Sequence, residues 1–316
     1  DFLPSTVTAL RGTFAFTGPV TGYTSWDVSN VQAFRGVFFQ ASNIADLSGW
    51  DVSQAVTLEG MFRASDFNSA VVSAWEVGTV EDFSALFEET SFNQPLSTWD
   101  MSSAVSLRAM FEANDAFNQP LDSWQLDSAT TLQAMFADTV AFNQPIFNAV
   151  QNVENFSSMF LGANAFSQDL TWDVTSGTDF RFMFKASAYS GLLDFTFKDT
   201  GTQDIDLSEM FAGVYDNLSK QPDPHGLEFW NSTDFRRVDK FMYGNTEGLK
   251  VYADTKSNDM SGWSATIPFC DKAFGAVEVN SQDHRNINFA SGVGNMGVQF
   301  PTFDNNGNKG LCNLND

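Results

Sequence analysis

Apolar residues recur along most of this chain in a pattern that repeats every 24 or 25 residues. Each clear repeat begins with a tryptophan and an acidic or polar residue, at Trp26-Asp27, Trp50-Asp51, Trp75-Glu76, Trp99-Asp100, Trp124-Gln125 and Trp172-Asp173. Eleven residues after the tryptophan comes an apolar pair such as Met61-Phe62 or Met110-Phe111. A period of this length predicts a solenoid, because no single unit can bury its apolar face alone.

The interval of eleven residues also finds repeats that lack the tryptophan. It leads from Met159-Phe160 back to Asn148, from Thr13-Phe14 back to Phe2, and from Phe241-Met242 back to Trp230. Met210-Phe211 follows Met183-Phe184 by 27 residues, which indicates an insertion. We therefore predict ten repeats in residues 1–242, the last two of them irregular, and a C-terminal capping region in residues 243–316.

Two apolar spacings within a repeat predict a strand and a short helix. The tryptophan and the residue two positions later alternate with polar residues, which is the periodicity of a strand with one buried face. Later apolar residues, such as Ala104, Leu107, Met110 and Phe111, fall on one face of a helix. Ser or Thr three residues after the tryptophan is a typical helix N-cap. Each repeat is therefore predicted to be a strand, a tight turn, a short helix and a loop.

The loop carries a motif of its own, at Phe92-Asn93-Gln94-Pro95, Phe117-Asn118-Gln119-Pro120 and Phe142-Asn143-Gln144-Pro145. We expect the phenylalanines of successive repeats to stack as a continuous spine. The asparagine side chains are expected to bond the backbone of the neighbouring turn. This motif is therefore interpreted as structural.

Residues 92–111 read FNQPLSTWDMSSAVSLRAMF, and this pattern resembles the BspA-type leucine-rich-repeat family. The similarity covers residues 1–211 well and 230–242 loosely, and Asn148-Ala149 departs from the family's Trp-Asp pair. The resemblance implies an α/β fold, a curved right-handed solenoid of strand-turn-helix units with a concave parallel sheet. It also implies a secreted or cell-surface protein, in a family of surface antigens and adhesins without a defined ligand.

Composition limits the partners that the chain can bind. Its 16 basic and 39 acidic residues give a formal net charge of -23. That charge is the opposite of what phosphate binding requires, so nucleic acid is excluded as a partner, and anionic membrane surfaces are disfavoured. No run of some twenty apolar residues occurs, so we expect no membrane insertion. The oligomeric state stays open.

Cys270 and Cys312, both in the predicted cap, are candidates for a disulfide in an oxidising compartment, the alternative being two free thiols. Asn155, Asn217 and Asn231 begin N-x-Ser/Thr sequons, which carry glycans in a eukaryotic host or arise by chance in an Asn-rich chain. Together with the family resemblance, these residues lead us to expect an extracellular protein.

Residues beside the core-facing tryptophan are expected to point outward and to form two columns. The acidic column is Asp27, Asp51, Glu76, Asp100, Gln125, Ala149 and Asp173. The column before the tryptophan is small or hydroxylated, at Ser25, Gly49, Ala74, Thr98, Ser123 and Thr171, and Phe147 interrupts it. Carboxylates stacked about 4.8 Å apart repel by about 1 kcal/mol in water. Either each Asp caps its own turn, or the column binds cations or a basic partner, and we predict that these columns are the ligand-binding face.

A second candidate lies in the predicted cap, where Asp304, Asn306 and Asn308 alternate as calcium ligands do in tight loops. The sixth position is Lys309 and the twelfth is Asn315, where a calcium loop has Gly and Glu. The alternative is an ordinary Asn-Gly turn. Calcium is the one cofactor that the sequence brings into consideration.

No catalytic motif appears, and the histidines, His225 and His284, lie outside the regular repeats. Equivalent carboxylates in equivalent repeats do not separate into an acid and a base. We therefore predict a non-enzymatic surface module for binding or adhesion, which recognises a protein or glycan partner along the acidic face, with possible help from a cation. The alternatives are a structural subunit of an extracellular layer or filament, and a carbohydrate-active enzyme with its site in the cap.

Overall fold

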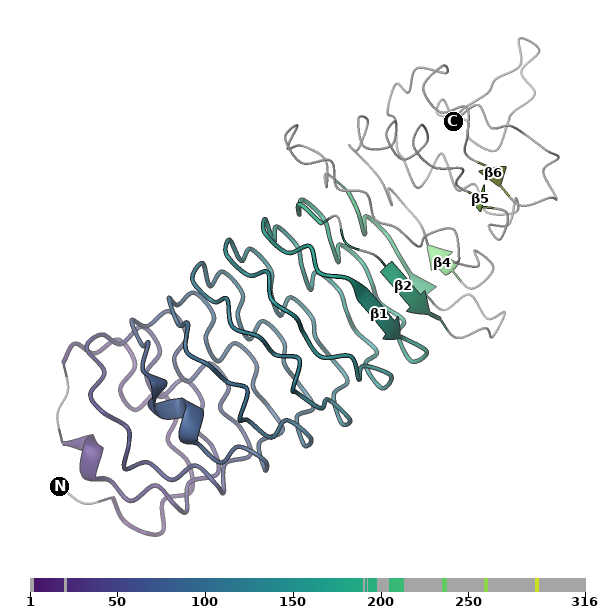
Figure 1. Cartoon of the computed structure of the whole chain (residues 1–316). Helices are drawn as coiled ribbons and strands as arrows, with labels where there is room; N and C mark the ends of the chain where they lie inside the picture. Colours follow the sequence, from purple (N-terminus) through teal and green to yellow (C-terminus); the bar gives the residue numbers. More distant parts are fainter. Residues whose placement is uncertain are drawn as a thin grey trace. The chain divides into compact units, whose positions relative to one another are not determined.

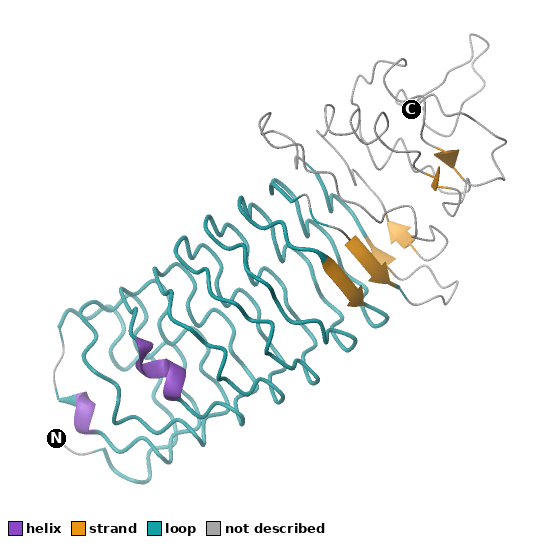
Figure 2. Ribbon diagram, viewed as in Figure 1, coloured by secondary structure: helices purple, strands orange, loops and turns teal. Residues whose placement is uncertain are grey.

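The computed structural model describes residues 3–19, 22–189, 191, 193–197 and 205–212, and beyond these only three short strands. Within these residues loops and turns dominate (Figures 1 and 2). The regular elements are two 3-10 helices, η1 (Tyr23–Ser25) and η2 (Ala70–Ala74), and the strands β1 (Leu170–Asp173), β2 (Leu193–Thr196), β3 (Ile205–Asp206), β4 (Phe235–Arg237), β5 (Asp259–Met260) and β6 (Asn288–Phe289). The strands form three parallel pairs, β1 with β2, β3 with β4, and β5 with β6.

The chain divides into two compact units, residues 1–153 with 163–165, and residues 154–162 with 166–316. In both units successive repeats run parallel to one another (Figure 1). We number positions within a repeat from the tryptophan as position 0. The bridges between repeats fall at position 7, joining Ala9, Ala33, Thr57, Asp82, Ser106 and Thr131 in the first unit, and Asn155, Asp179 and Asp206 in the second.

The predicted α/β fold of strand-turn-helix units is wrong. The described residues contain no α-helix, and the segment expected to be helical is a series of tight turns. In the described residues of repeats one to nine the backbone is left-handed at position 10, and in repeats one to eight also at position 14, with φ between 52° and 64°. These are position 10 (Gly12, Gly36, Gly60, Ala85, Ala109, Ala134, Ser158, Phe182 and Glu209) and position 14 (Phe16, Gln40, Ala64, Glu89, Ala113, Asp138, Gly162 and Ala186). A right-handed helix cannot pass through such residues.

Hydrogen bonds between repeats replace the helical ones. The amide of Leu107 donates to the carbonyl of Thr131 in the next repeat at 3.1 Å, and that of Ala109 donates to Gln133 at 2.8 Å. The amide of Met110 closes a turn on Leu107 instead, at 3.3 Å. A positive φ at the third residue of that turn is typical of type II. Successive three-residue turns repeat apolar residues at the same interval as a helix, which is why the spacing was misleading.

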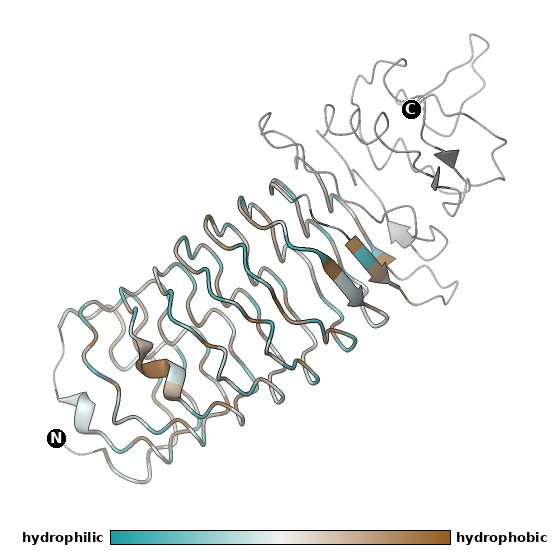
Figure 3. Cartoon of the chain, viewed as in Figure 1, coloured by the Kyte–Doolittle hydropathy of each residue, from teal (hydrophilic) through white to brown (hydrophobic). Residues whose placement is uncertain are grey.

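The predicted strand at the tryptophan is regular only in the second unit. There β1 contains Trp172, and its residues alternate between buried and exposed, as do those of β2. Figure 3 shows the same alternation of hydrophobic and hydrophilic residues along β2. In the first unit the described residues around each tryptophan form turns and extended segments, with the 3-10 helices η1 and η2 directly before Trp26 and Trp75, and without strand pairing. The parallel register is therefore held mainly at position 7, seven residues later.

Aromatic rings fill the core of each unit. In the first unit Phe38, Phe62, Phe87, Phe111 and Phe136 stack with centroids 5.7 to 5.8 Å apart. A second column, Phe67, Phe92, Phe117 and Phe142, packs against the first at 3.8 to 4.1 Å. In the second unit Phe160, Phe184 and Phe211 stack 5.4 Å apart. The expected phenylalanine spine is thus present, as two columns within the first unit.

The loop asparagines link one repeat to the next, as predicted. The Oδ1 atom of Asn93 accepts from the amide of Asn118 at 3.0 Å and from Nε2 of Gln119 at 2.9 Å. Asn68 accepts in the same way from Asn93 and Gln94. These bonds agree with the structural interpretation of the loop motif.

Candidate functional site

The carboxylates next to the tryptophans lie on the surface. Asp27, Asp51, Glu76 and Asp100 are all exposed, and we name this set in the first unit the acidic strip. The tryptophans behind it point inward, since Trp50, Trp75 and Trp99 are at most 8% exposed. Gln125 is exposed and Ala149 is half-buried, so the strip of carboxylates ends at Asp100 within this unit.

Each aspartate of the acidic strip caps its own turn. Oδ1 of Asp27 accepts from the amide of Ser29 at 3.1 Å, and Oδ1 of Asp51 accepts from the amide of Ser53 at 2.9 Å. Asp100 and Ser102 form the same bond at 3.0 Å. Hydrogen bonds from the serine lower the pKa of Asp27 and of Asp100, because they favour the charged carboxylate. Asp27 and Asp100 are therefore anionic at neutral pH, and one oxygen of each aspartate of the acidic strip is used locally.

The column before the tryptophan is smooth, and its hydroxyl groups point back to the backbone. Thr98 Oγ1 donates to the carbonyl of Ser73 at 2.6 Å, and Ser123 Oγ donates to the carbonyl of Ser97 at 3.0 Å. At Gly49 an added Cβ would lie 3.2 Å from the carbonyl oxygen of Thr24. Ser25, Ala74 and Thr171 are exposed like these residues. Phe147 differs from the prediction, because it is fully buried and replaces the missing tryptophan of its repeat in the core.

Two adjoining grooves follow the acidic strip. One is lined by Asp51, Trp75 and Glu76, and by Ser48. The other is lined by Trp75, Glu76 and Asp100, and by Thr79 and Thr98. Three of the four carboxylates of the acidic strip thus line a groove, and Trp75 lies in the wall of both.

In the second unit Asp173 occupies the corresponding exposed position on β1. Its Oδ1 accepts from the amide of Thr175 at 3.1 Å. Thr171 pairs with Asp194 on β2, and both are exposed. Asp194 was missed by the sequence analysis, because Phe195 takes the place of the tryptophan there and stacks on Trp172 at 5.7 Å.

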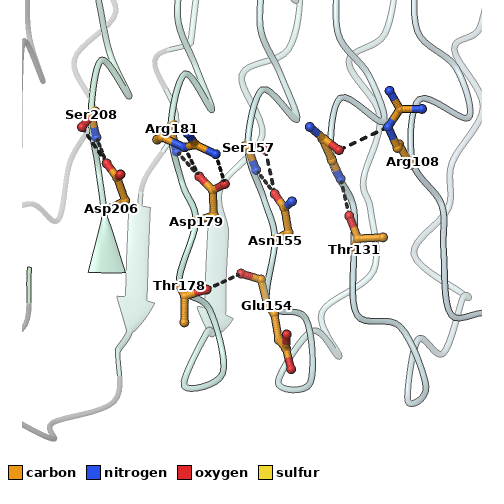
Figure 4. A network of polar contacts seen from close by, with 11 residues as sticks. Arg108, Thr131, Glu154, Asn155, Ser157, Thr178, Asp179, Arg181, Asp206 and Ser208 are labelled. Carbon is orange, nitrogen blue, oxygen red and sulfur yellow. Dashed lines mark hydrogen bonds and ion pairs between the residues drawn. The ribbon is translucent and has the colours of Figure 1, made fainter. Parts of the chain in front are cut away.

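A second polar column, at position 7, was also missed. Its side chains accept from the amide two residues later, as in Asp82 with Ser84 at 3.0 Å and Thr131 with Gln133 at 3.2 Å. In the second unit Asn155, Asp179 and Asp206 do the same (Figure 4). The signal was a hydrogen-bonding residue seven positions after nearly every tryptophan, hidden among apolar neighbours that favoured a helix.

Basic residues lie near this column and pair with acids of neighbouring repeats. We name positions 7–14 of each repeat the turn segment. Arg35 contacts Glu59, and Arg63 Nη2 lies 2.8 Å from Glu88 Oε1. In the second unit Lys185 Nζ lies 2.6 Å from Glu209 Oε2. Burial raises the pKa of Glu59, Glu88 and Glu112, and the nearby arginines counteract only part of that effect.

Several predicted sites lie outside the described residues: Asp304, Asn306, Asn308, Cys270, Cys312, Asn217, Asn231, and the boundary at residues 242 and 243. Asn155 is described, and its Oδ1 accepts from both the amide and the hydroxyl of Ser157. Among the residues that can be placed, no three His, Cys, Asp or Glu side chains gather closely enough to hold a metal ion. Nor does that part of the chain contain a helix with the length and apolarity to cross a membrane.

Comparison with protein families gives one informative match. The family model described as "Mycoplasma protein of unknown function, DUF285" matches residues 5–124, 64–171 and 147–223, which together span more than half of the chain. The chain belongs to the DUF285 family. The DUF285 matches overlap at residues 64–124 and 147–171, as expected when a family model and a chain are both built from the same unit. Neither a curated protein nor a solved structure matches this DUF285 chain.

Proposed function

We propose that this DUF285 protein is a non-enzymatic binding module whose acidic strip contacts an extended, positively charged partner. One observation carries the proposal. The ion pairs among the described residues involve Glu59, Glu88, Glu89, Asp179 and Glu209, and none of them involves a carboxylate of the acidic strip. Exposed carboxylates without a cation of their own are available to one from outside.

The regular spacing of the acidic strip supports an extended partner. Its carboxylates come from consecutive repeats, and grooves lie over Asp51, Glu76 and Asp100. A partner with positive groups along a chain, a basic polypeptide or an amine-bearing glycan, can meet several carboxylates at once. Each exposed pair contributes little, but several together give useful affinity and a strong dependence on salt.

The resemblance to BspA-type surface proteins supports an extracellular site of action, which we include in the proposal. Detection of the protein on intact cells with an antibody, with and without protease treatment, tests this part. Protein found only inside the cells would contradict the extracellular location but not the proposed binding by the acidic strip.

The test of the binding function is the triple variant Asp51→Asn, Glu76→Gln, Asp100→Asn. The amide groups still accept the capping bonds, so the turns are kept while three charges are lost. Binding to immobilised basic peptides and amine-bearing glycans should fall about tenfold, as expected for three exposed ion pairs. The matched control is Glu81→Gln, Asp115→Asn, Asp138→Asn, which removes three exposed charges elsewhere in the same unit. Equal losses in both variants would show that net charge, and not the acidic strip, governs binding.

A further inference from the structure

No further inference is drawn: the strongest candidate, the surface patch of the first repeat where the ring of Phe16 is 70% exposed and meets Phe39 edge to face at 5.0 Å, carries nothing, because nothing in the part of the chain that the structure describes shows what covers it.

Discussion

The carboxylates of the acidic strip and those of the turn segments differ in their exposure and in whether a basic side chain lies beside them. In the acidic strip Asp27, Asp51 and Asp100 accept bonds from amides two residues away and meet no basic side chain of the described residues. In the turn segments Glu59 and Glu88 are partly buried and lie against an arginine of the preceding repeat. The difference follows exposure, because a solvated carboxylate is stable without a counter-ion and a buried one is not.

Carboxylates that form ion pairs within the fold are therefore distinct from carboxylates that are available to a partner. The arginines of the first unit that form ion pairs stabilise repeat against repeat, so they do not neutralise the acidic strip. Net charge alone, at -23, could not have made that distinction. Two sets of changes test the difference in charge between the two regions, and a third compares their backbones; we give them from the largest expected effect to the smallest.

The largest effect is expected where a buried carboxylate loses its partner. Arg63→Met keeps an apolar chain over Phe39 but leaves Glu88, whose side chain is 12% exposed, without its cation. We expect a loss of about 1–2 kcal/mol in the free energy of unfolding, reduced from the value for a fully buried pair because Arg63 is 41% exposed. Urea unfolding measures it.

The control for that change lies in the acidic strip. Glu76→Gln removes an exposed charge and should alter stability by less than about 0.5 kcal/mol. Adding Glu88→Gln to Arg63→Met should recover part of the lost stability, because no unpaired charge then remains. If Arg63→Met and Glu76→Gln change the free energy of unfolding by the same amount, the distinction between the two regions is wrong.

A change of pH should have an intermediate effect on the free energy of unfolding. The sign should differ between Glu112 in a turn segment and Asp100 in the acidic strip. Burial raises the pKa of Glu112 above its ordinary 4.5, so the folded state holds the proton more tightly than the unfolded state. Its stabilising contribution is complete below pH 4.5 and is lost as the pH rises through the folded pKa. The stability of the unmodified protein relative to Glu112→Gln should therefore fall as the pH rises above 4.5.

Asp100 should show the reverse. Its pKa is lowered from 3.8 by hydrogen bonds from Ser102, so its contribution is present above pH 3.8 and disappears as the pH falls through the folded pKa. Carboxyl carbon chemical shifts across a pH titration give both pKa values directly. If the pKa values of Glu112 and Asp100 were shifted in the same direction from their ordinary values, the contrast between the two regions would be contradicted.

The smallest effect concerns the backbone. Gln40 is exposed and has φ of 52°, so Gln40→Gly removes a left-handed strain and should stabilise the fold by up to about 1 kcal/mol. The same change in the column of the acidic strip, Gln125→Gly, lacks that benefit because Gln125 is not left-handed, and should destabilise by about 0.5–1 kcal/mol. Thermal unfolding compares the two, and equal signs would count against left-handed turns at position 14.

The sequence predicted the buried residues of each repeat better than its backbone conformation. Trp99, Met101, Leu107 and Phe111 were identified from spacing, and all are at most 4% exposed. Spacing could not distinguish a helix from successive tight turns, since both return an apolar side chain after three residues. The unused signal was glycine at position 10 of three consecutive early repeats, at Gly12, Gly36 and Gly60, where φ is positive.

The candidate site was predicted in part. The outward direction of Asp51 and Asp100 followed from alternation with a buried neighbour, and their capping of Ser53 and Ser102 was one of two alternatives considered. The unpaired indole nitrogens of Trp26 and Trp75 could not be predicted, because both repeats keep the usual Trp-acid pair.

In the regular repeats the amides at positions 6 and 7 donate to the preceding repeat, and those at positions 8, 10, 12 and 14 donate to the next. Every joint between regular repeats therefore uses the same atoms. A gene that duplicates or loses one segment of 24 or 25 residues creates no new kind of joint, and lengthens or shortens the row of carboxylates by one. The length of the acidic strip can thus evolve by copy number alone, without a single new kind of side chain.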